Sequence, residues 1–213
     1  MKNSEAPLVV KVWGDYACFT RPEMKVERVT YPVMTPSAAR GVLNAIFWKP
    51  EFLWCVEEIQ VLKPIQHISL LRNEVNSVLP VQEALKPGYA YFADNDRAQR
   101  HTLALRDVAY LIKAQIRVVA GAEKNVYAYR DQFRRRVERG QCYWQPYLGC
   151  REFSAHFCLP DGTEQPIAHS DDLGRMLFDL RYDAKGKPTE PLFFHAYLEN
   201  GVLKVPQDLY DIL

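Results

Sequence analysis

One segment, TPSAARGVLNAIFWKP at residues 35–50, has the pattern of a helix with defined ends. Thr35 is placed to cap the N-terminus, Pro36 fits the first turn, and Pro50 ends the helix because proline cannot continue it. The apolar side chains recur at helical spacing and form a stripe of Ala39, Val42, Leu43 and Ile46. The segment therefore predicts one amphipathic helix whose apolar stripe faces the core.

Strand-like segments lie on both sides of this helix. Residues 8–16, LVVKVWGDY, are rich in β-branched side chains and end at Gly-Asp, which is typical of a strand followed by a turn. Residues 54–71 alternate well enough to predict a long strand with a break at Pro64. Residues 72–99 are polar and contain turn-forming residues, so they predict a long loop of the kind that carries function.

The same pattern recurs further along the chain. Residues 102–119 predict a strand, residues 123–139 a helix with Val126, Phe133 and Val137 on one face, and residues 153–159 another strand. The order of elements is therefore β-α-β, loop, β-α-β. This order predicts an α+β fold of the ferredoxin-like (RRM-like) βαββαβ type, in which two helices cover one face of a four-stranded antiparallel sheet.

The C-terminal part predicts strands only. Apolar runs at residues 176–180, 191–198 and 202–205 are typical of strands, and Asn200-Gly201 between the last two is a strong hairpin signal. We expect a small antiparallel sheet beside the main domain. The predicted organisation is a ferredoxin-like domain over residues 1–160, with an excursion at 72–101, and a C-terminal β-sheet extension over residues 161–213.

Composition excludes several classes of protein. The chain has 213 residues and a formal net charge of only +1, and no stretch approaches the length of a membrane span. The N-terminus lacks the apolar core of a signal peptide, so we expect a cytoplasmic protein without a membrane partner. Its 5 cysteines and 5 histidines show neither a disulfide framework nor metal-ligand spacing. We predict no metal and no cofactor.

The positive charge is concentrated in one region. Six arginines, opposed only by Asp131 and Glu138, lie between residues 129 and 151: Arg130, Arg134, Arg135, Arg136, Arg139 and Arg151. On a helix, Arg135, Arg136 and Arg139 fall on the face opposite the apolar stripe. A solvated helix face is the alternative, but mutual repulsion favours phosphate binding, to which Arg40 and Lys49 of the first helix are expected to add.

Several motifs resemble one protein family. They are VWGDYACFTRP at 12–22, TPSAARG at 35–41, LRNEV at 71–75, TLALRDV at 102–108, FRRR at 133–136 and GQCYWQPYLGCREF at 140–153. Together they resemble the Cas-five family of CRISPR-associated proteins, in its type I-C (Dvulg) subfamily, over nearly the whole chain. The resemblance implies a metal-independent endoribonuclease that cuts the repeat hairpin of precursor CRISPR RNA and stays bound as a subunit of the interference complex.

Such a cut needs particular side chains. Without a metal, the RNA's own 2′-OH attacks the adjacent phosphate, so the protein must accept one proton, donate another and stabilise the phosphorane. The resemblance implies a tyrosine just before Trp-Lys-Pro and a Lys-His pair at the start of the second helix, but Phe47 and Ala128-Tyr129 stand there. The predicted substitutes are Tyr129 in the histidine's place and Tyr127, with Lys124 or Arg130 as the cation.

Alternatives remain open at this stage. Tyr127 and Tyr129 are as well suited to packing or base stacking as to catalysis. Trp13, Phe19 and Trp48 are expected in the core, whereas Phe47 is expected on the catalytic face. His67 and His101 are fallback bases, and His156 and His195 are expected to be structural. The alternative function is a catalytically silent subunit that binds the 5′ handle of CRISPR RNA, with duplex DNA as a further ligand of the same arginines.

Overall fold

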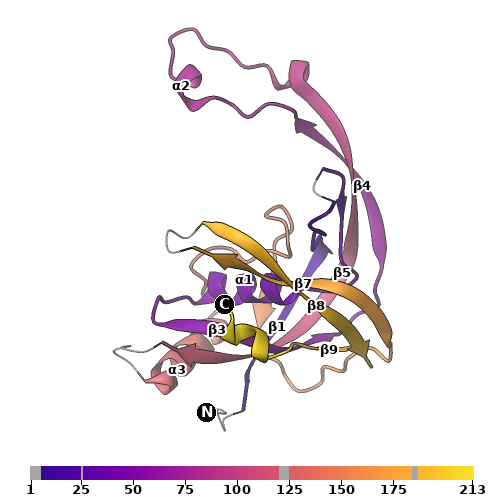
Figure 1. The fold of residues 1–213 in the computed structure, drawn as a ribbon, viewed down its shortest axis with the longest axis vertical. Helices are drawn as coiled ribbons and strands as arrows, with labels where there is room; N and C mark the ends of the chain where they lie inside the picture. The colour runs from indigo at the N-terminus through magenta and orange to yellow at the C-terminus, as the bar shows by residue number, and fades with distance from the viewer. Residues whose placement is uncertain (1–5, 25, 120–124, 184–186) are drawn as a thin grey trace.

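In the computed structural model, which describes residues 6–24, 26–119, 125–183 and 187–213, strands dominate and helices are few (Figure 1). The strands are β1 Leu8–Ala17, β2 Arg28–Val29, β3 Phe52–Val61, β4 His67–Val75, β5 Arg97–Val118, β6 His156–Cys158, β7 Asp171–Tyr182, β8 Pro188–Glu199 and β9 Val202–Lys204. The helices are α1 Pro36–Ile46, α2 Val81–Ala84 and α3 Val126–Glu138, with 3₁₀ turns η1 Ala93–Asp96 and η2 Asp208–Asp211.

The described strands join into one mostly antiparallel sheet. Its order is β6-β1-β5-β3-β9-β8-β7, while β2 and β4 also pair with β5. The long strand β5 serves two sets of neighbours: its residues 105–118 pair with β1 and β3, and its residues 97–105 pair with β4. Asp107, just past the junction, has a positive φ of 51°. Aspartate tolerates this left-handed conformation, so the strand can change direction there.

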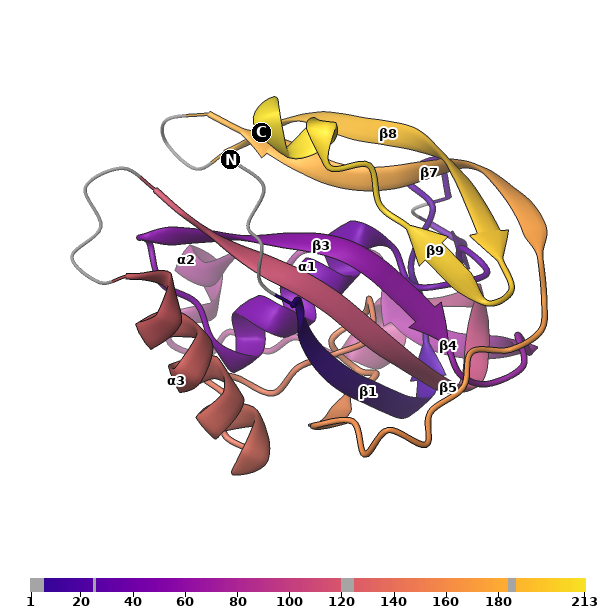
Figure 2. The same ribbon diagram turned by 90° about the horizontal axis from the view of Figure 1, so that it is seen from below.

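The two longer helices form as predicted, with shorter ends. The Thr35 hydroxyl accepts a hydrogen bond from the Ala38 N–H at 3.3 Å, as a cap should. Helix α1 ends at Ile46 rather than Pro50 because Phe47 is already extended, at φ −153° and ψ 116°. Helix α1 contacts β3 on one side and β7 on the other, whereas α3 lies against β1 and β5 (Figure 2).

The predicted break at Pro64 in the strand pattern of residues 54–71 is confirmed. The chain forms two strands, β3 and β4, because the segment between Val61 and His67 contains Pro64, which has no N–H to donate to a ladder. Strand β4 pairs with β3's neighbour β5 in a long hairpin, so residues 72–75 and 97–101 of the predicted loop are strand. The ends of β4 and β5 form an arm that projects from the body (Figure 1).

The C-terminal strands extend the main sheet. The predicted hairpin turn is confirmed, since Asn200 and Gly201 both have positive φ, at 47° and 75°. Strand β9 pairs with β3 through Ile59 and Leu203, so β7, β8 and β9 continue the sheet where a separate small sheet was expected. Figure 2 shows these strands curving over α1, so that α1 lies against β7. Helix α1 also contacts α3.

Candidate nucleic-acid interface

Helix α3 turns its apolar residues inward, as its sequence pattern predicts. The Asn125 side chain caps the helix by accepting a hydrogen bond from the Ala128 N–H at 3.1 Å. Phe133 and Val137 are buried, and Val126 is half-buried against the core. The opposite face of the helix is exposed, and its arginines are Arg134, Arg135 and Arg139.

Two arginines of the predicted binding set have structural roles. Arg130 is 4% exposed and donates to the Gln115 side-chain oxygen at 2.8 Å and to the Ala6 carbonyl at 2.5 Å. Arg136 donates to the Ile46 carbonyl at 2.8 Å, and its guanidinium carbon lies 5.3 Å from the centre of the Phe47 ring. Both side chains bind the protein itself, which corrects the expectation that they face RNA.

Arg40 also holds the fold together. Its guanidinium lies 2.6 Å from the carboxylate of Asp179 on β7, and Asp179 is 3% exposed. Burial raises the pKa of the Asp179 carboxyl, and the positive charge of Arg40 opposes that rise. This ion pair fixes α1 to the C-terminal strands, so Arg40 belongs to packing and not to the expected phosphate-binding surface.

The two aromatic residues expected at the reaction centre lie in the core. Phe47 and Tyr129 are 1% and 2% exposed, and their ring centres are 6.5 Å apart. Phe52 packs against both, at 5.3 Å and 5.2 Å. A phosphate would have to displace this packing to reach either ring, so the expectation that Phe47 marks an open catalytic face is corrected. Lys124, the expected cation, lies outside the described residues.

Other predicted residues do face solvent. Lys49 is exposed directly after α1, and Tyr127 in the first turn of α3 is 59% exposed. His67 and His101 are exposed on β4 and β5, but His101 pairs with Leu71, four residues along the strand from His67. The two histidines are therefore about 13 Å apart along the strand and do not share one site.

Three further aromatic residues, near the end of α1 and in the segment after α3, are also exposed. Trp48 is 57% exposed, against the expectation that it lies in the core, and Tyr143 and Trp144 are 70% and 63% exposed. The backbone N–H groups of Tyr143 and Trp144 donate to the Ala45 carbonyl, at 2.8 Å and 3.4 Å. The segment after α3 thus lies against the C-terminal end of α1, immediately before Trp48 and Lys49.

The exposure of Tyr143 and Trp144 was not predicted from the sequence, although two adjacent aromatic residues in a polar segment are a signal for an exposed stacking surface. Their rings lie edge to face with centres 4.3 Å apart. We call the exposed set Trp48, Lys49, Tyr127, Arg134, Arg135, Arg139, Tyr143 and Trp144 the basic-aromatic face. Cations for phosphates and rings for bases are the groups by which proteins bind single-stranded or folded RNA.

A second group of arginines lies at the base of the arm. Arg72 is paired with Glu74 and with Glu152, and Arg28 lies 3.5 Å from Glu152. A cavity of about 600 Å³ opens beside them, lined by Arg28, Glu74, Asp94 and Arg97 among others. Because carboxylates pair with these arginines, the cavity has mixed charge. Among the described residues, Arg134 of α3 forms an ion pair with Asp131 at 3.7 Å.

The match to known proteins covers almost all of the sequence. A family model described as "CRISPR-associated protein (Cas_Cas5)" matches residues 7–206. The chain belongs to the Cas5 family of CRISPR-associated proteins. The resemblance seen in its motifs is confirmed, including the type I-C subfamily.

Curated Cas5 relatives support this assignment, and a solved structure has the same fold. A protein of Thermus thermophilus named "CRISPR pre-crRNA endoribonuclease Cas5d" is 46% identical, over 98% of this chain and 95% of its own length. A protein of the same name from Mannheimia succiniciproducens is 45% identical over 92% of both chains. A solved "CRISPR-associated Protein" has the same fold, with a TM-score of 0.68 at 23% identity, over 94% of this chain and 92% of that one.

Membrane-spanning helices and metal-binding clusters are both absent from the described residues. No described helix has the length and apolar character needed to cross a membrane. In the same part of the chain, no three or more His, Cys, Asp or Glu side chains are grouped in a way that could hold a metal ion.

Proposed function

We propose that this Cas5 chain is a metal-independent endoribonuclease that cuts the repeat hairpin of precursor CRISPR RNA by 2′-OH attack. The observation that carries the proposal is 46% identity, over 98% of the chain, to a protein named as a CRISPR pre-crRNA endoribonuclease. The product then stays bound, and the protein becomes a subunit of the type I-C interference complex in the cytoplasm. The basic-aromatic face supports RNA binding because it offers cations and rings together.

The chemistry needs a proton acceptor that the RNA can reach. Tyr127 takes the role first expected of Tyr129, because Tyr127 is 59% exposed in the first turn of α3 while Tyr129 is buried. Lys124, close before the helix, supplies the cation for the phosphorane. Arg134, Arg135, Arg139 and Lys49 hold the flanking phosphates. Only the small deprotonated fraction of a phenol can accept a proton at neutral pH, so the reaction is slow.

Cleavage of the cognate repeat RNA in the presence of EDTA tests this function. The wild-type protein is expected to cut at the base of the hairpin and to leave a cyclic phosphate and a 5′-OH. Tyr127→Phe is expected to lower the single-turnover rate by about 10²–10⁴-fold, as loss of a general base does. Tyr143→Phe is the matched control, since it removes an exposed phenol from the same face. Cleavage by Tyr127→Phe at the wild-type rate would contradict the role of Tyr127.

A second candidate function is a silent RNA-binding subunit. The burial of Phe47 and Tyr129 at the family's catalytic positions favours it, because neither side chain can meet a phosphate as packed. In that case the wild-type protein binds the 5′ handle tightly in the same assay and yields no product. Duplex DNA is a further ligand of the same arginines, and its binding should weaken steeply with salt.

The core of the molecule supports a ferredoxin-like (RRM-like) assignment. The strand order β6-β1-β5-β3, with a helix after β1 and after β5, is the order of a split βαβ unit. We assign residues 1–160 to this RNA-binding unit and residues 161–213 to a C-terminal extension that widens its sheet.

The arm supports docking to other subunits of the complex. Its tip exposes several apolar side chains, among them Val78 at 91%, Val81 at 74%, Leu85 at 79% and Phe92 at 67%. Apolar side chains gathered on a projecting hairpin are typical of a protein interface. Val81→Asp with Leu85→Asp should abolish copurification with the neighbouring subunits while leaving RNA binding by the isolated chain unchanged. Undiminished copurification would contradict a docking role for the arm.

A further inference from the structure

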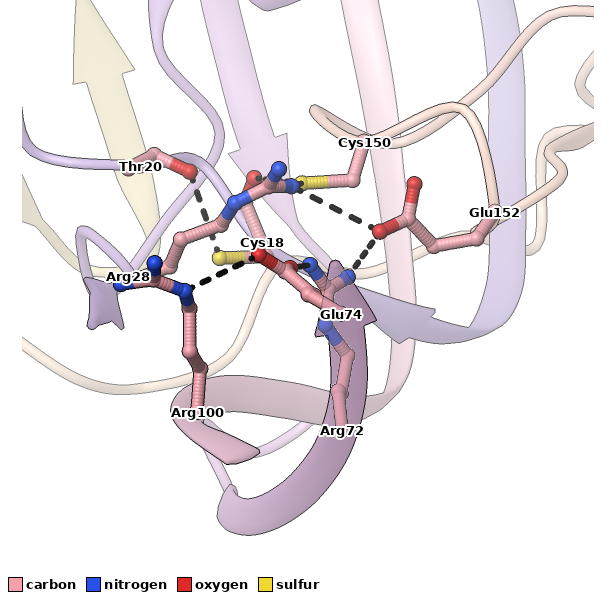
Figure 3. Close-up of polar contacts among 8 residues, drawn as sticks. All are labelled: Cys18, Thr20, Arg28, Arg72, Glu74, Arg100, Cys150 and Glu152. Atoms are coloured by element: carbon pink, nitrogen blue, oxygen red, sulfur yellow. Dashed lines mark hydrogen bonds and ion pairs between the residues drawn. The ribbon is translucent and has the colours of Figure 1, made fainter. Parts of the chain in front are cut away.

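Two cysteines from distant parts of the chain meet beside the base of the arm. Cys18 follows β1, and Cys150 lies 132 residues further along, in the segment before β6 (Figure 3). The Cys18 N–H donates to the Leu148 carbonyl at 3.0 Å, and the Cys150 sulfur lies 3.6 Å from the Cys18 carbonyl oxygen.

Gly149 permits this close approach. Its φ is +84°, and a Cβ at this position would lie 2.1 Å from the Cys18 carbonyl oxygen. Any residue with a side chain would therefore push the two backbone segments apart. The turn that carries Cys150 is built to lie directly against Cys18.

The surroundings make the two sulfurs chemically different. Arg28 donates to the Cys150 sulfur at 3.0 Å, as Figure 3 shows, while the Cys18 sulfur lies 3.5 Å from the Thr20 hydroxyl. The neighbouring Cys18 side chain lowers the pKa of the Cys150 thiol, and Arg28 adds to this effect against burial. The neighbouring Cys150 side chain raises the pKa of the Cys18 thiol, and burial adds to this rise. A thiolate beside a thiol is the pairing that thiol oxidation uses.

We propose that Cys18 and Cys150 are a redox-active pair, which a hydroperoxide converts into a disulfide. The Cys150 thiolate attacks one oxygen of hydrogen peroxide, the O–O bond breaks, and hydroxide leaves and takes up a proton, which gives water and a sulfenic acid on Cys150. The Cys18 sulfur then attacks the Cys150 sulfur, the S–O bond breaks, and the oxygen leaves as a second water with the Cys18 proton. The two sulfurs lose two electrons, and the peroxide is reduced to two waters.

Oxidation changes the charge at the base of the arm. Arg28 contacts the Cys150 sulfur, which attacks as the thiolate, and also lies 3.5 Å from the carboxylate of Glu152. A disulfide carries no charge, so its formation leaves Arg28 with Glu152 alone, and Glu152 is shared with Arg72. Arg28 lines the cavity at the base of the arm, so this cavity becomes more positive on oxidation.

Thiol mapping of the folded protein tests the proposal. The protein is treated with hydrogen peroxide, quenched with catalase, denatured and alkylated with iodoacetamide. Intact mass is expected to fall from 5 alkylated cysteines to 3, since the chain has five cysteines in all. Peptide mapping without reductant is expected to give one cross-linked species that joins Cys18 to Cys150 and disappears with dithiothreitol.

Two variants and one denatured sample test whether the cross-link is specific to Cys18 and Cys150. Cys55→Ala removes another buried thiol and should leave the cross-link intact. Cys18→Ala should instead leave a sulfenic acid on Cys150, which dimedone traps. Peroxide treatment in guanidinium chloride should give no preferred Cys18–Cys150 link, because the folded structure brings the two together. Retention of both thiols in the folded wild type, while the half-buried Cys142 or Cys158 is oxidised, would overturn the proposal.

Discussion

Individual arginines of one helix have different roles in this protein. Arg134 and Arg135 are exposed, whereas Arg130 is buried against Gln115 and Arg136 binds the end of α1. Helical spacing correctly places Phe133 on the buried face. It cannot tell where a long arginine side chain turns, because such a side chain can fold over its own helix to reach a carbonyl. The exposed part of the binding face was therefore predictable from sequence only in outline.

Phe47 allows a test at the level of a single atom. Phe47→Tyr restores the family's tyrosine, but it adds a hydroxyl to a ring that is 1% exposed and packed on Phe52. We expect the free energy of unfolding to fall by about 1–3 kcal/mol, because overpacking strains a core, with no gain in the cleavage rate. Urea unfolding and single-turnover cleavage measure both quantities. Phe92→Tyr, on the exposed arm, is the control and should leave stability nearly unchanged. Faster cleavage by Phe47→Tyr would place the reaction there after all.

Among the elements, the contact between the end of α1 and the segment after α3 organises the basic-aromatic face. The carbonyls of Ala45 and Ile46 have no partner within the helix, and Tyr143, Trp144 and Arg136 supply donors for them. Arg136 also places a positive charge at the negative end of the helix dipole. This contact joins residues about 100 positions apart, so sequence patterns could predict both helices but not their meeting.

Trp144 should contribute binding energy through its exposed ring. Trp144→Ala is expected to weaken binding of the repeat RNA by about 1–3 kcal/mol, which is the usual contribution of one stacked base. Thermal stability should not change, because the side chain is 63% exposed. Fluorescence anisotropy with labelled RNA measures the affinity. Tyr197→Ala, 55% exposed on β8, is the matched control and should bind as the wild type does. Equal affinities for all three proteins would remove Trp144 from the face.

The attachment of α1 to β7 gives a prediction about pH. Burial raises the folded-state pKa of Asp179 above its value in the unfolded chain, although Arg40 opposes the rise. The group's contribution to stability is therefore fully present below the unfolded pKa of about 3.9 and is lost as the pH rises through the folded value. Relative to Asp179→Asn, the wild type should lose stability as the pH rises above about 4, by about 1.4 kcal/mol for each unit by which the folded and unfolded pKa values differ.

Urea unfolding of both proteins at each pH measures this difference directly. Asparagine keeps an oxygen that Arg40 can bond, so the comparison isolates the charge of Asp179. If the wild type instead gains stability relative to Asp179→Asn as the pH rises, the attraction of Arg40 outweighs burial, and the assigned direction is wrong.

On the scale of the whole molecule, the order and type of most helices and strands were predictable from the sequence. The pairing of strands that are far apart in the sequence was less predictable. The hairpin turn at Asn200-Gly201 and the cap at Thr35 are local signals, and both were predicted correctly. The pairing of β9 with β3, which merges the C-terminal strands with the main sheet, joins segments about 145 residues apart and leaves no local trace. The outer part of the arm was mistaken for a loop because the half-buried positions of β4 there are the charged Arg72 and Glu74, so the sequence lacks the apolar alternation that predicts a strand.

The salt dependence of RNA binding tests the central claim, that the exposed arginines of α3 hold the RNA phosphates. Affinity for the repeat RNA is measured over a series of salt concentrations for the wild type, for Arg134→Ala/Arg135→Ala/Arg139→Ala, and for Arg117→Ala/Arg175→Ala/Arg181→Ala. The second triple variant makes the same charge change at β5 and β7. We predict that the α3 variant binds more weakly and that its slope of log affinity against log salt is smaller by about 2–3 units. The control variant should match the wild type. Equal losses in both variants, or none in the α3 variant, would contradict the account.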